Sequence, residues 1–418
     1  MPFNSTSCAC RRAEVSDLDL GFGGQRVPLP AHISLFHSGD ADLGDLVEFL
    51  RGAIGPSREA FVLLGPPGAP AAFLKSLEGS LGRKLDDEVA SGRLVLMEGD
   101  RDPDAQLTKL VHTITTLTAN GATAVRVLAL VAWEVPGWPA AEDLLWIESR
   151  LANACANLPV AIICAYDVTS LPGPALIYAG IESHGLVCIG GKVASNPLVV
   201  APEAYLAGRL LRLPWLSRDA SAISGNAHGM HACAFFMSRD EEYATLLPLI
   251  EEGVARGQAA FHVIDPQRRA DHLQRLNQGG LDVEGLQSSE QLEVRNWHEI
   301  YLMHDRFDPE RTLGQWDEVL AARPGGVHVV ADMSWALERA PGVDALVEYE
   351  ARFNELRTRH SDTVICTYDS ARFAAATMLD ILRAHPVVIL AGVPQDNGLY
   401  TKPAALISEL HGRTATAT

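Results

Sequence analysis

The chain carries one set of residues twice, at a spacing the size of a domain. The motif Cys-Ala-Tyr-Asp at 164–167 recurs as Cys-Thr-Tyr-Asp at 366–369, 202 positions later. Trp133 recurs at the same offset as Trp335, and a Glu-x-Arg pair that begins at Glu148 does the same. Solenoids and propellers repeat every 20–50 residues or so, whereas a period near 200 is the length of a whole domain. The sequence therefore predicts two tandem domains, each with its own core.

Composition and charge narrow the function classes. Hydrophobic residues make up 47% and charged residues 21% of the chain, as in globular proteins. No apolar stretch is long enough to span a bilayer and no secretion signal is present, so we expect a cytoplasmic protein without membrane contact. Seven cysteines, several in apolar runs, suit a reducing compartment. A formal charge of −18 argues against direct contact with nucleic acid, whose phosphates require a basic face.

Apolar runs alternate with amphipathic stretches in the same order in both halves. A strand predicted over 32–38 corresponds to one over 231–238, and a helix predicted over 142–156 corresponds to one over 344–357. Strands that alternate with helices of this length indicate an α/β fold with a mostly parallel sheet flanked by helices.

The predicted domain boundaries follow from this alternation. They are a flexible tail over 1–27, a first domain over 28–202, a linker over 203–227, a second domain over 228–412 and a tail over 413–418.

Ligands of parallel α/β sheets bind at the carboxyl ends of the strands, so the residues after each strand are the candidates. The segment 65–72 has the outline of a phosphate loop, but Pro-Ala-Ala at 70–72 stands where a second Gly, a Lys and a Ser or Thr are needed. In the second half the matching turn begins with Asp265, which repels phosphate, and holds Arg268 and Arg269, which attract it. We expect degenerate phosphate-binding loops, no catalytic residue and no enzyme activity.

Three acidic residues follow predicted strands. Asp332 has the form of the carboxylate that holds Mg²⁺ in nucleotide hydrolases, yet Val131 stands at the matching place of the first half. Asp167 and Asp369 follow the repeated Tyr. Each of the three acids has two readings, ligand binding or capping of the next turn, and capping is favoured.

The repeated aromatic residues are candidates for a ligand site. Trp133 with Tyr166, and Trp335 with Tyr368, would form an aromatic wall with polar tips at the ends of adjacent strands. Such a wall suits a small, mostly apolar molecule with one or two hydrogen-bonding groups. The alternative is that these rings only close the top of the sheet.

The spacing of histidines and cysteines along the sequence gives little support for a metal site or for a catalytic nucleophile. His228 and His231 are spaced as two ligands without a nearby third, and Cys8 and Cys10 lie in the predicted tail. The repeated cysteines stand in apolar strands, where a thiol packs and does not attack. We predict no metal site and no cofactor.

Several blocks of the second half together resemble a known family, the methanogen/methylotroph sensory (MEDS) domains. The blocks lie at 307–320, 327–337, 348–356, 364–369 and 385–392. The first half resembles the family more distantly: it keeps Trp133, Glu148, the motif at 164–167 and His184, but lacks the Asp-Met-Ser-Trp of the second half.

The resemblance implies a fold and a function. MEDS domains are similar to RecA/KaiC-type ATPase cores that have lost their phosphate-binding residues, and they are regarded as sensors of small molecules. With duplicated aromatic sites on such a catalytically stripped core, we expect the ligand to lie near Asp332, Ser334, Trp335, Tyr368 and His385. No output module is expected in this chain, so a partner protein, a kinase or a transcription regulator, would carry the signal.

Two other readings remain open. One is a nucleotide-binding or hydrolysing enzyme that uses Asp332 with Arg268 and Arg269. The other is a scaffold whose two copies pack as a pseudo-symmetric pair and self-associate as a homo-oligomer.

Overall fold

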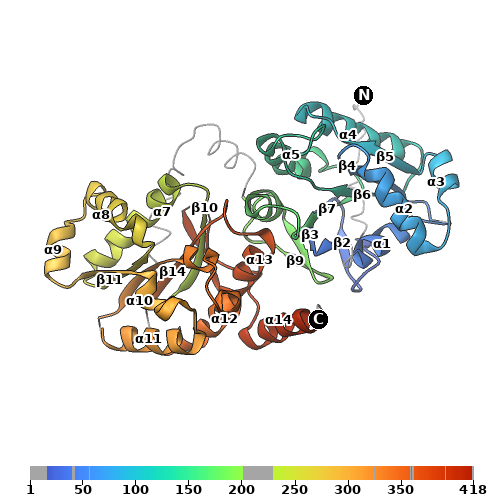
Figure 1. Cartoon of the computed structure of the whole chain (residues 1–418). Helices are drawn as coiled ribbons and strands as arrows, with labels where there is room; N and C mark the ends of the chain where they lie inside the picture. The colour runs from blue at the N-terminus through green and yellow to red at the C-terminus, as the bar shows by residue number, and fades with distance from the viewer. Residues whose placement is uncertain are drawn as a thin grey trace, which may run out of the picture.

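A computed structural model shows two α/β domains side by side (Figure 1). It describes residues 17–200 and 229–416, apart from positions 40–42, 56, 324, 358, 360–361 and 391. Each domain is built on one seven-stranded sheet. The predicted tandem α/β architecture is confirmed.

The first sheet has the strand order β5-β4-β6-β7-β3-β8-β9. Neighbouring strands are parallel except for the antiparallel pair at the β9 edge. The strands are β3 (Ala31–His37), β4 (Ala60–Gly65), β5 (Leu94–Glu98), β6 (Val125–Leu130), β7 (Val160–Asp167), β8 (Leu186–Ile189) and β9 (Lys192–Ser195).

The second sheet repeats this topology strand for strand, in the order β12-β11-β13-β14-β10-β15-β16. Only the edge pair β15 and β16 is antiparallel. The strands are β10 (His231–Phe236), β11 (Ala259–Ile264), β12 (Leu292–Asn296), β13 (Val327–Asp332), β14 (Thr363–Asp369), β15 (Val387–Leu390) and β16 (Val393–Asp396).

Helices connect the strands and cover both faces of each sheet (Figure 1). Those of the first domain are α1 (Gly44–Arg51), α2 (Ala69–Leu81), α3 (Asp86–Ala90), α4 (Pro103–Ala119), α5 (Ala141–Ala154) and the π-helix η2 (Ala175–Ile181). The α-helices of the second domain are α7 (Arg239–Ala255), α8 (Arg269–Gln278), α9 (Val283–Ser288), α10 (Trp297–Ile300), α11 (Pro309–Ala321), α12 (Leu346–Arg357), α13 (Ala375–Ala384) and α14 (Pro403–Thr416). Short 3₁₀ turns add η4 (Pro266–Arg268), η5 (Met303–Asp305), η6 (Met333–Leu337) and η7 (Val343–Ala345).

Two corresponding helices begin for the same local reason in both domains. Asp102 caps α4 by accepting from two backbone N–H groups of the first turn, and Asp308 caps α11 by accepting from the N–H of Arg311. A proline follows each cap at the first helical position, where its missing N–H removes no helical hydrogen bond. These Asp-Pro pairs fix where the two covering helices start.

The central strands are buried on both faces, which explains their continuous apolar runs. Every residue of β4, β10 and β13 is buried. One core lies under α1 and α2 in the first domain and another under α7 and α8 in the second. The remaining core, under α4 and α5 in the first domain and under α11, α12 and α13 in the second, runs continuously through both domains.

The shared core marks a pseudo-symmetric interface between the two copies. Pro172 and Ala374, which are 202 positions apart and so equivalent, form a single antiparallel β-bridge with each other. A pseudo-twofold axis therefore passes between them. Beside it, α13 packs against η2, and a Cβ on Gly173 would lie 2.2 Å from Sδ of Met378. The backbones meet closely here because Gly173 has no side chain.

Strand connections reverse direction between β10 and β14. From β10 the chain crosses through α7 towards β11 on one side, whereas from β14 it crosses through α13 to β15 on the other. Because the two connections run to opposite sides, they leave a crevice at the carboxyl ends of β10 and β14. Ligands of open α/β sheets usually bind in such a crevice.

The boundaries differ from those predicted in two places. The predicted flexible tail over 1–27 is wrong from residue 17 onward, where β1 (Asp17–Asp19) and β2 (Arg26–Pro28) form an antiparallel hairpin. Leu18, Leu20 and Phe22 of this segment are buried in the core under α1, and so few apolar residues gave too short a pattern to recognise. The last helix, α14, reaches Thr416 and includes residues assigned to the C-terminal tail. The linker over 203–227 and residues 1–16 lie outside the described residues.

The pairing register corrects one equivalence. Ala331 pairs with Cys366, and Ala129 pairs with Cys164. Leu130, and not Val131, is therefore the counterpart of Asp332, although both residues of the first domain are apolar. Among the described residues, no helix has the length and apolar character needed to cross a membrane.

Candidate functional site

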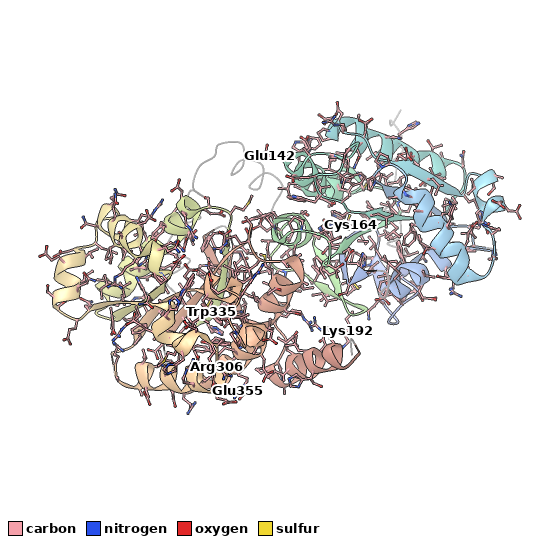
Figure 2. All side chains as sticks on the ribbon, in the orientation of Figure 1. Glu142, Cys164, Lys192, Arg306, Trp335 and Glu355 are labelled. Atoms are coloured by element: carbon pink, nitrogen blue, oxygen red, sulfur yellow. The ribbon has the colours of Figure 1, made fainter. Side chains whose placement is uncertain are left out.

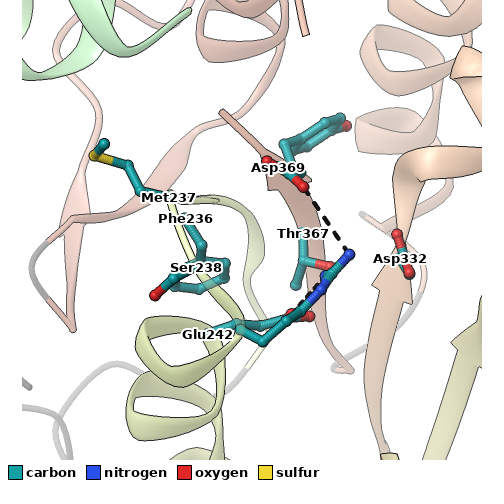
Figure 3. A pocket seen from close by; sticks show the side chains of 9 residues that line it. Phe236, Met237, Ser238, Glu242, Asp332, Thr367 and Asp369 are labelled. Atoms are coloured by element: carbon teal, nitrogen blue, oxygen red, sulfur yellow. Dashed lines mark hydrogen bonds and ion pairs between the residues drawn. The ribbon is translucent and has the colours of Figure 1, made fainter. Parts of the chain in front are cut away.

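A pocket of about 170 Å³ opens at the reversal of strand connections in the second domain (Figure 3). It lies at the carboxyl ends of β10, β13 and β14 and at the N-terminus of α7. The lining residues are Phe236, Met237, Ser238, Arg239, Glu242, Asp332, Thr367, Tyr368 and Asp369. We call it the edge pocket.

The walls of the edge pocket are charged. Arg239 donates to Glu242 at 2.8 Å and lies 4.0 Å from a carboxylate oxygen of Asp369. Beneath them, Arg268 donates to Glu242 at 2.8 Å and to Asp332 at 2.5 Å. Burial raises the pKa of Glu242, and the guanidinium of Arg268 opposes that rise. Two arginines thus bridge three carboxylates, with Phe236 and Met237 as the apolar side.

The structure brings three of the predicted ligand residues together in this pocket: Asp332, Tyr368 and Asp369. Both acids also cap turns, as the favoured reading predicted. Oδ1 of Asp332 accepts from the N–H of Ser334 at 3.0 Å, and Oδ1 of Asp369 accepts from the N–H of Ala371 at 3.1 Å. With its second oxygen held by Arg268, the Asp332 carboxylate is engaged on both sides.

Trp335 lies elsewhere, inside the second domain (Figure 2). Its ring stacks on Tyr301 at a centroid distance of 4.7 Å and contacts Phe307 at 4.4 Å. Trp335 has no exposed surface, and Ser334 beside it is also buried. Because η6 turns the chain inward after β13, and because the Tyr368 ring is also fully buried in the same core, the predicted aromatic wall does not form.

Asp265 does not reach the edge pocket either. Its side chain caps the turn η4 and accepts from the N–H of Gln267 at 2.8 Å. The phosphate-loop candidate of the first domain is likewise engaged, because the N–H of Gly68 donates to the carboxylate of Glu98 at 3.0 Å. Both turns present carboxylates where a phosphate would need positive charge.

At the equivalent edge of the first domain, neighbouring residues engage Asp167. Asp167 accepts from the N–H of Gly39 at 3.0 Å and from the N–H of Thr169 at 3.0 Å, and its other oxygen accepts from Ser170 at 3.1 Å. These hydrogen bonds lower the pKa of Asp167 although burial opposes them. Tyr166 is fully buried, and Trp133 is half-buried against the core.

His385, the remaining predicted residue, belongs to a second assembly deep in the same domain. Nε2 of His385 lies 3.4 Å and Nε2 of His231 3.2 Å from Oε2 of Glu350. Sγ of Cys366 lies 3.6 Å from Nε2 of His231 and 3.8 Å from the same glutamate oxygen. All four side chains are buried. Strand β10, helix α12, strand β14 and the end of α13 each contribute one residue.

The first domain contains the same assembly, built from the equivalent elements. His32 of β3 and His184 after η2 place Nε2 at 3.2 Å and 3.5 Å from Oε2 of Glu148. Sγ of Cys164 lies 3.4 Å from Nε2 of His32 and 3.5 Å from that oxygen. In each domain the four ligand atoms lie within 4.8 Å of one another, and these residues could hold a metal ion. We call these assemblies the buried quartets.

Sequence reasoning singled out several of these residues but missed that they come together. Arg239 and Glu242 lie on the helix after β10 and stood out in no motif. The quartet residues are spread over more than 150 positions in each domain, so no local spacing reveals them. The available signal was the duplication itself, because a histidine, a glutamate, a cysteine and a second histidine recur in the same order.

A comparison with protein families gives one match. The model of the methanogen/methylotroph, DcmR sensory domain (MEDS) matches residues 31–184 and again residues 230–386. No curated protein matches the chain.

Proposed function

The chain belongs to the MEDS family of sensory domains, and from this premise we propose that it is a non-enzymatic sensory protein whose second domain binds a small molecule in the edge pocket. The observation that carries the proposal is the position of this pocket. It opens where the strand connections reverse, and Arg239, Asp332 and Asp369 present charge there.

The lining favours a particular class of ligand. Phe236 and Met237 offer an apolar wall, while Arg239 faces carboxylates that hold it in place. A ligand that covers a charged side chain removes water from it, which costs free energy unless the ligand supplies a new polar partner. The pocket therefore selects molecules that carry a complementary polar group. We infer that the ligand is small and amphipathic, with a polar or anionic group towards Arg239, and is less apolar than the aromatic residues alone suggest.

A signalling partner completes the proposal. Ligand binding at the N-terminus of α7 changes the surface formed by α7 and the loop after β14, and a kinase or a transcription regulator that contacts this surface receives the signal. The formal charge of −18 favours a protein partner over nucleic acid, and we place the protein in the cytoplasm.

A thermal-shift screen tests the ligand site. Small amphipathic acids, alcohols and amides, together with ATP and Mg²⁺, are added to the full chain, and a compound at 100 times its Kd should add about 2.7 kcal/mol of stability. The Arg239→Met variant should lose that shift. Arg256→Met, at the far end of the same helix, is the matched control and should keep it. The proposal fails if no compound stabilises the chain, or if the shift persists when both Arg239→Met and Asp369→Asn are present.

A further inference from the structure

We propose that each buried quartet binds one divalent transition-metal ion, best matched by zinc, through two imidazole nitrogens, one carboxylate oxygen and one thiolate. The ligands are His32, Glu148, Cys164 and His184 in the first domain and His231, Glu350, Cys366 and His385 in the second.

Ligand spacing supports tetrahedral coordination. Bonds of about 2.0–2.1 Å to nitrogen or oxygen and about 2.3 Å to sulfur place neighbouring ligand atoms about 3.3 Å apart for N and O and about 3.6 Å apart for N and S. In the second domain the corresponding separations are 3.2 and 3.4 Å for N and O and 3.6 Å for N and S. In the first domain they are 3.2, 3.5 and 3.4 Å. These three of the six edges in each quartet fit a zinc ion at its centre.

Hydrogen bonds around the second quartet point the imidazole lone pairs inward. Nδ1 of His385 donates to the carbonyl of Ile381 at 2.8 Å, since a carbonyl only accepts. Asn354 donates to the carbonyl of Ala384 at 2.7 Å, which turns its oxygen towards Nδ1 of His231 at 3.0 Å. Both neutral imidazoles therefore carry their proton on Nδ1. Outer partners of this kind set the tautomer of metal-bound histidines.

With these tautomers, the two Nε2 atoms and the glutamate oxygen at the centre of the second quartet are all hydrogen-bond acceptors. The lone pairs of His231 and His385 both face the carboxylate of Glu350, and Nε2 of His385 finds no hydrogen-bond partner among the described residues. A cation between the ligand atoms satisfies all of them.

The charges balance when a divalent ion is bound. A glutamate carboxylate and a cysteine thiolate supply two negative charges, and the two imidazoles are neutral. Binding releases the thiol proton of Cys366 or Cys164 to solvent. Each occupied quartet is then electrically neutral, as a fully buried site requires.

Duplication gives independent support. The four ligand types recur in the same order, on corresponding elements, and Nδ1 of His184 donates to the carbonyl of Ala179 at 2.9 Å as His385 does to Ile381. Both spans that match the family model begin beside the first histidine and extend to the second. Without a bound ion, each quartet would cost free energy of folding, because its charged and polar groups are buried. The chain would bear that cost in both domains.

The two sites differ in access. Asn354, which orients His231, is replaced in the first domain by Ala152, and Nδ1 of His32 has no hydrogen-bond partner among the described residues. A pocket of about 140 Å³, lined by Pro30, His32, Ala152 and Cys155, leads to that histidine from outside. The first site should therefore bind metal more weakly and exchange it faster than the second.

Metal content of the purified full chain tests the assignment. After equilibration with excess Zn²⁺ and removal of free metal, elemental analysis should find two zinc ions per chain. Cys164→Ser and Cys366→Ser should each lower that number towards one, and the double variant should approach none. Cys188→Ser, which changes a buried cysteine outside both quartets, should retain two. Fewer than half an ion per chain in the unaltered protein would overturn the proposal.

Cobalt substitution gives a spectroscopic signal that these residues would not produce if they only packed in the core. Loading with Co²⁺ alone should produce the visible bands of a tetrahedral site and a near-ultraviolet sulfur-to-cobalt transition. Cys188→Ser should keep both features, whereas the double cysteine variant should lose the sulfur transition. A spectrum of hexaaqua cobalt in the unaltered chain would contradict the proposal. In chelator competition, one ion should leave about 10–100 times more readily than the other, and Ala152→Asn should narrow the difference.

Discussion

The hydroxyl of Tyr368 donates a hydrogen bond of 2.8 Å to Oε1 of Glu350, while the same tyrosine lines the edge pocket. Glu350 places its other oxygen at the centre of the second buried quartet. One side chain therefore connects the proposed ligand site with the proposed metal site. A change at either end can reach the other through a single buried hydrogen bond.

Replacement of Tyr368 by Phe should weaken the second site selectively. The change leaves an acceptor of Glu350 unpaired inside the core, at a cost of about 1–3 kcal/mol in unfolding free energy. Loss of this outer partner should lower metal affinity at the second site about 10–100-fold. Urea unfolding and chelator competition measure the two effects. The first site serves as the internal control, and equal weakening of both sites would contradict the link.

Arg268 should be the most sensitive residue of the pocket floor. It holds Glu242 and Asp332, which are both buried, so Arg268→Met removes a cationic partner from both carboxylates and leaves Asp332 only the N–H of Ser334. Breaking such an arrangement costs about 3–5 kcal/mol. Arg256→Met, which removes a half-exposed partner of Glu252, should cost no more than about 1 kcal/mol. Denaturant titration of both variants makes the comparison, and similar losses would refute the assigned role.

Stability of the second domain should fall as the pH drops below about 6.5. Burial lowers the pKa of His328 to about 4, against about 6.5 in an unfolded chain. Between these values the unfolded state binds the extra proton, so the unfolding free energy decreases as pH falls. His328→Leu should reduce the slope by about 1.4 kcal/mol per pH unit in that window. Val330→Ala, in the same strand, should lower stability without changing the slope. Unfolding curves from pH 7 to pH 4 distinguish the two variants.

A side chain at Gly173 should disturb the interface between the domains. A Cβ there would lie 2.2 Å from Met378 and 2.5 Å from the carbonyl of Ser370. Gly173→Val should therefore cost about 1–3 kcal/mol through overpacking and make the two domains unfold in separate transitions in calorimetry. Gly79→Ala, where a Cβ meets nothing within 4 Å, should be neutral or slightly stabilising. A single unchanged transition in Gly173→Val would show that the close packing at Gly173 is not what couples the two domains.

The fold followed from the sequence because its signals are local and repeated. The duplication fixed the number of domains, and apolar runs between amphipathic stretches fixed the α/β class and most elements. The hairpin over residues 17–28 escaped because strands of three residues carry almost no period. The similarity to RecA/KaiC-type cores stays a prediction.

The sites were harder to predict because tertiary packing decides them. Trp335 follows β13 and Tyr368 lies in the neighbouring strand β14, yet both rings are fully buried in the core and form no aromatic wall at the pocket. The quartets join residues from two strands and two helices, and Cys366 was interpreted as packing because a thiol in an apolar strand normally is. Only the tertiary structure shows that two histidines and a glutamate converge on it.

The hydrogen-exchange footprint of a stabilising compound tests the sensory proposal most directly. Exchange in the full chain is compared with and without a compound that raises the Tm. We predict protection over residues 236–242 and 367–369, where β10, α7 and β14 surround the edge pocket, with smaller changes around Glu350 transmitted through Tyr368. Protection confined to the first domain, or to the outer surface of α14, would contradict ligand sensing at this site.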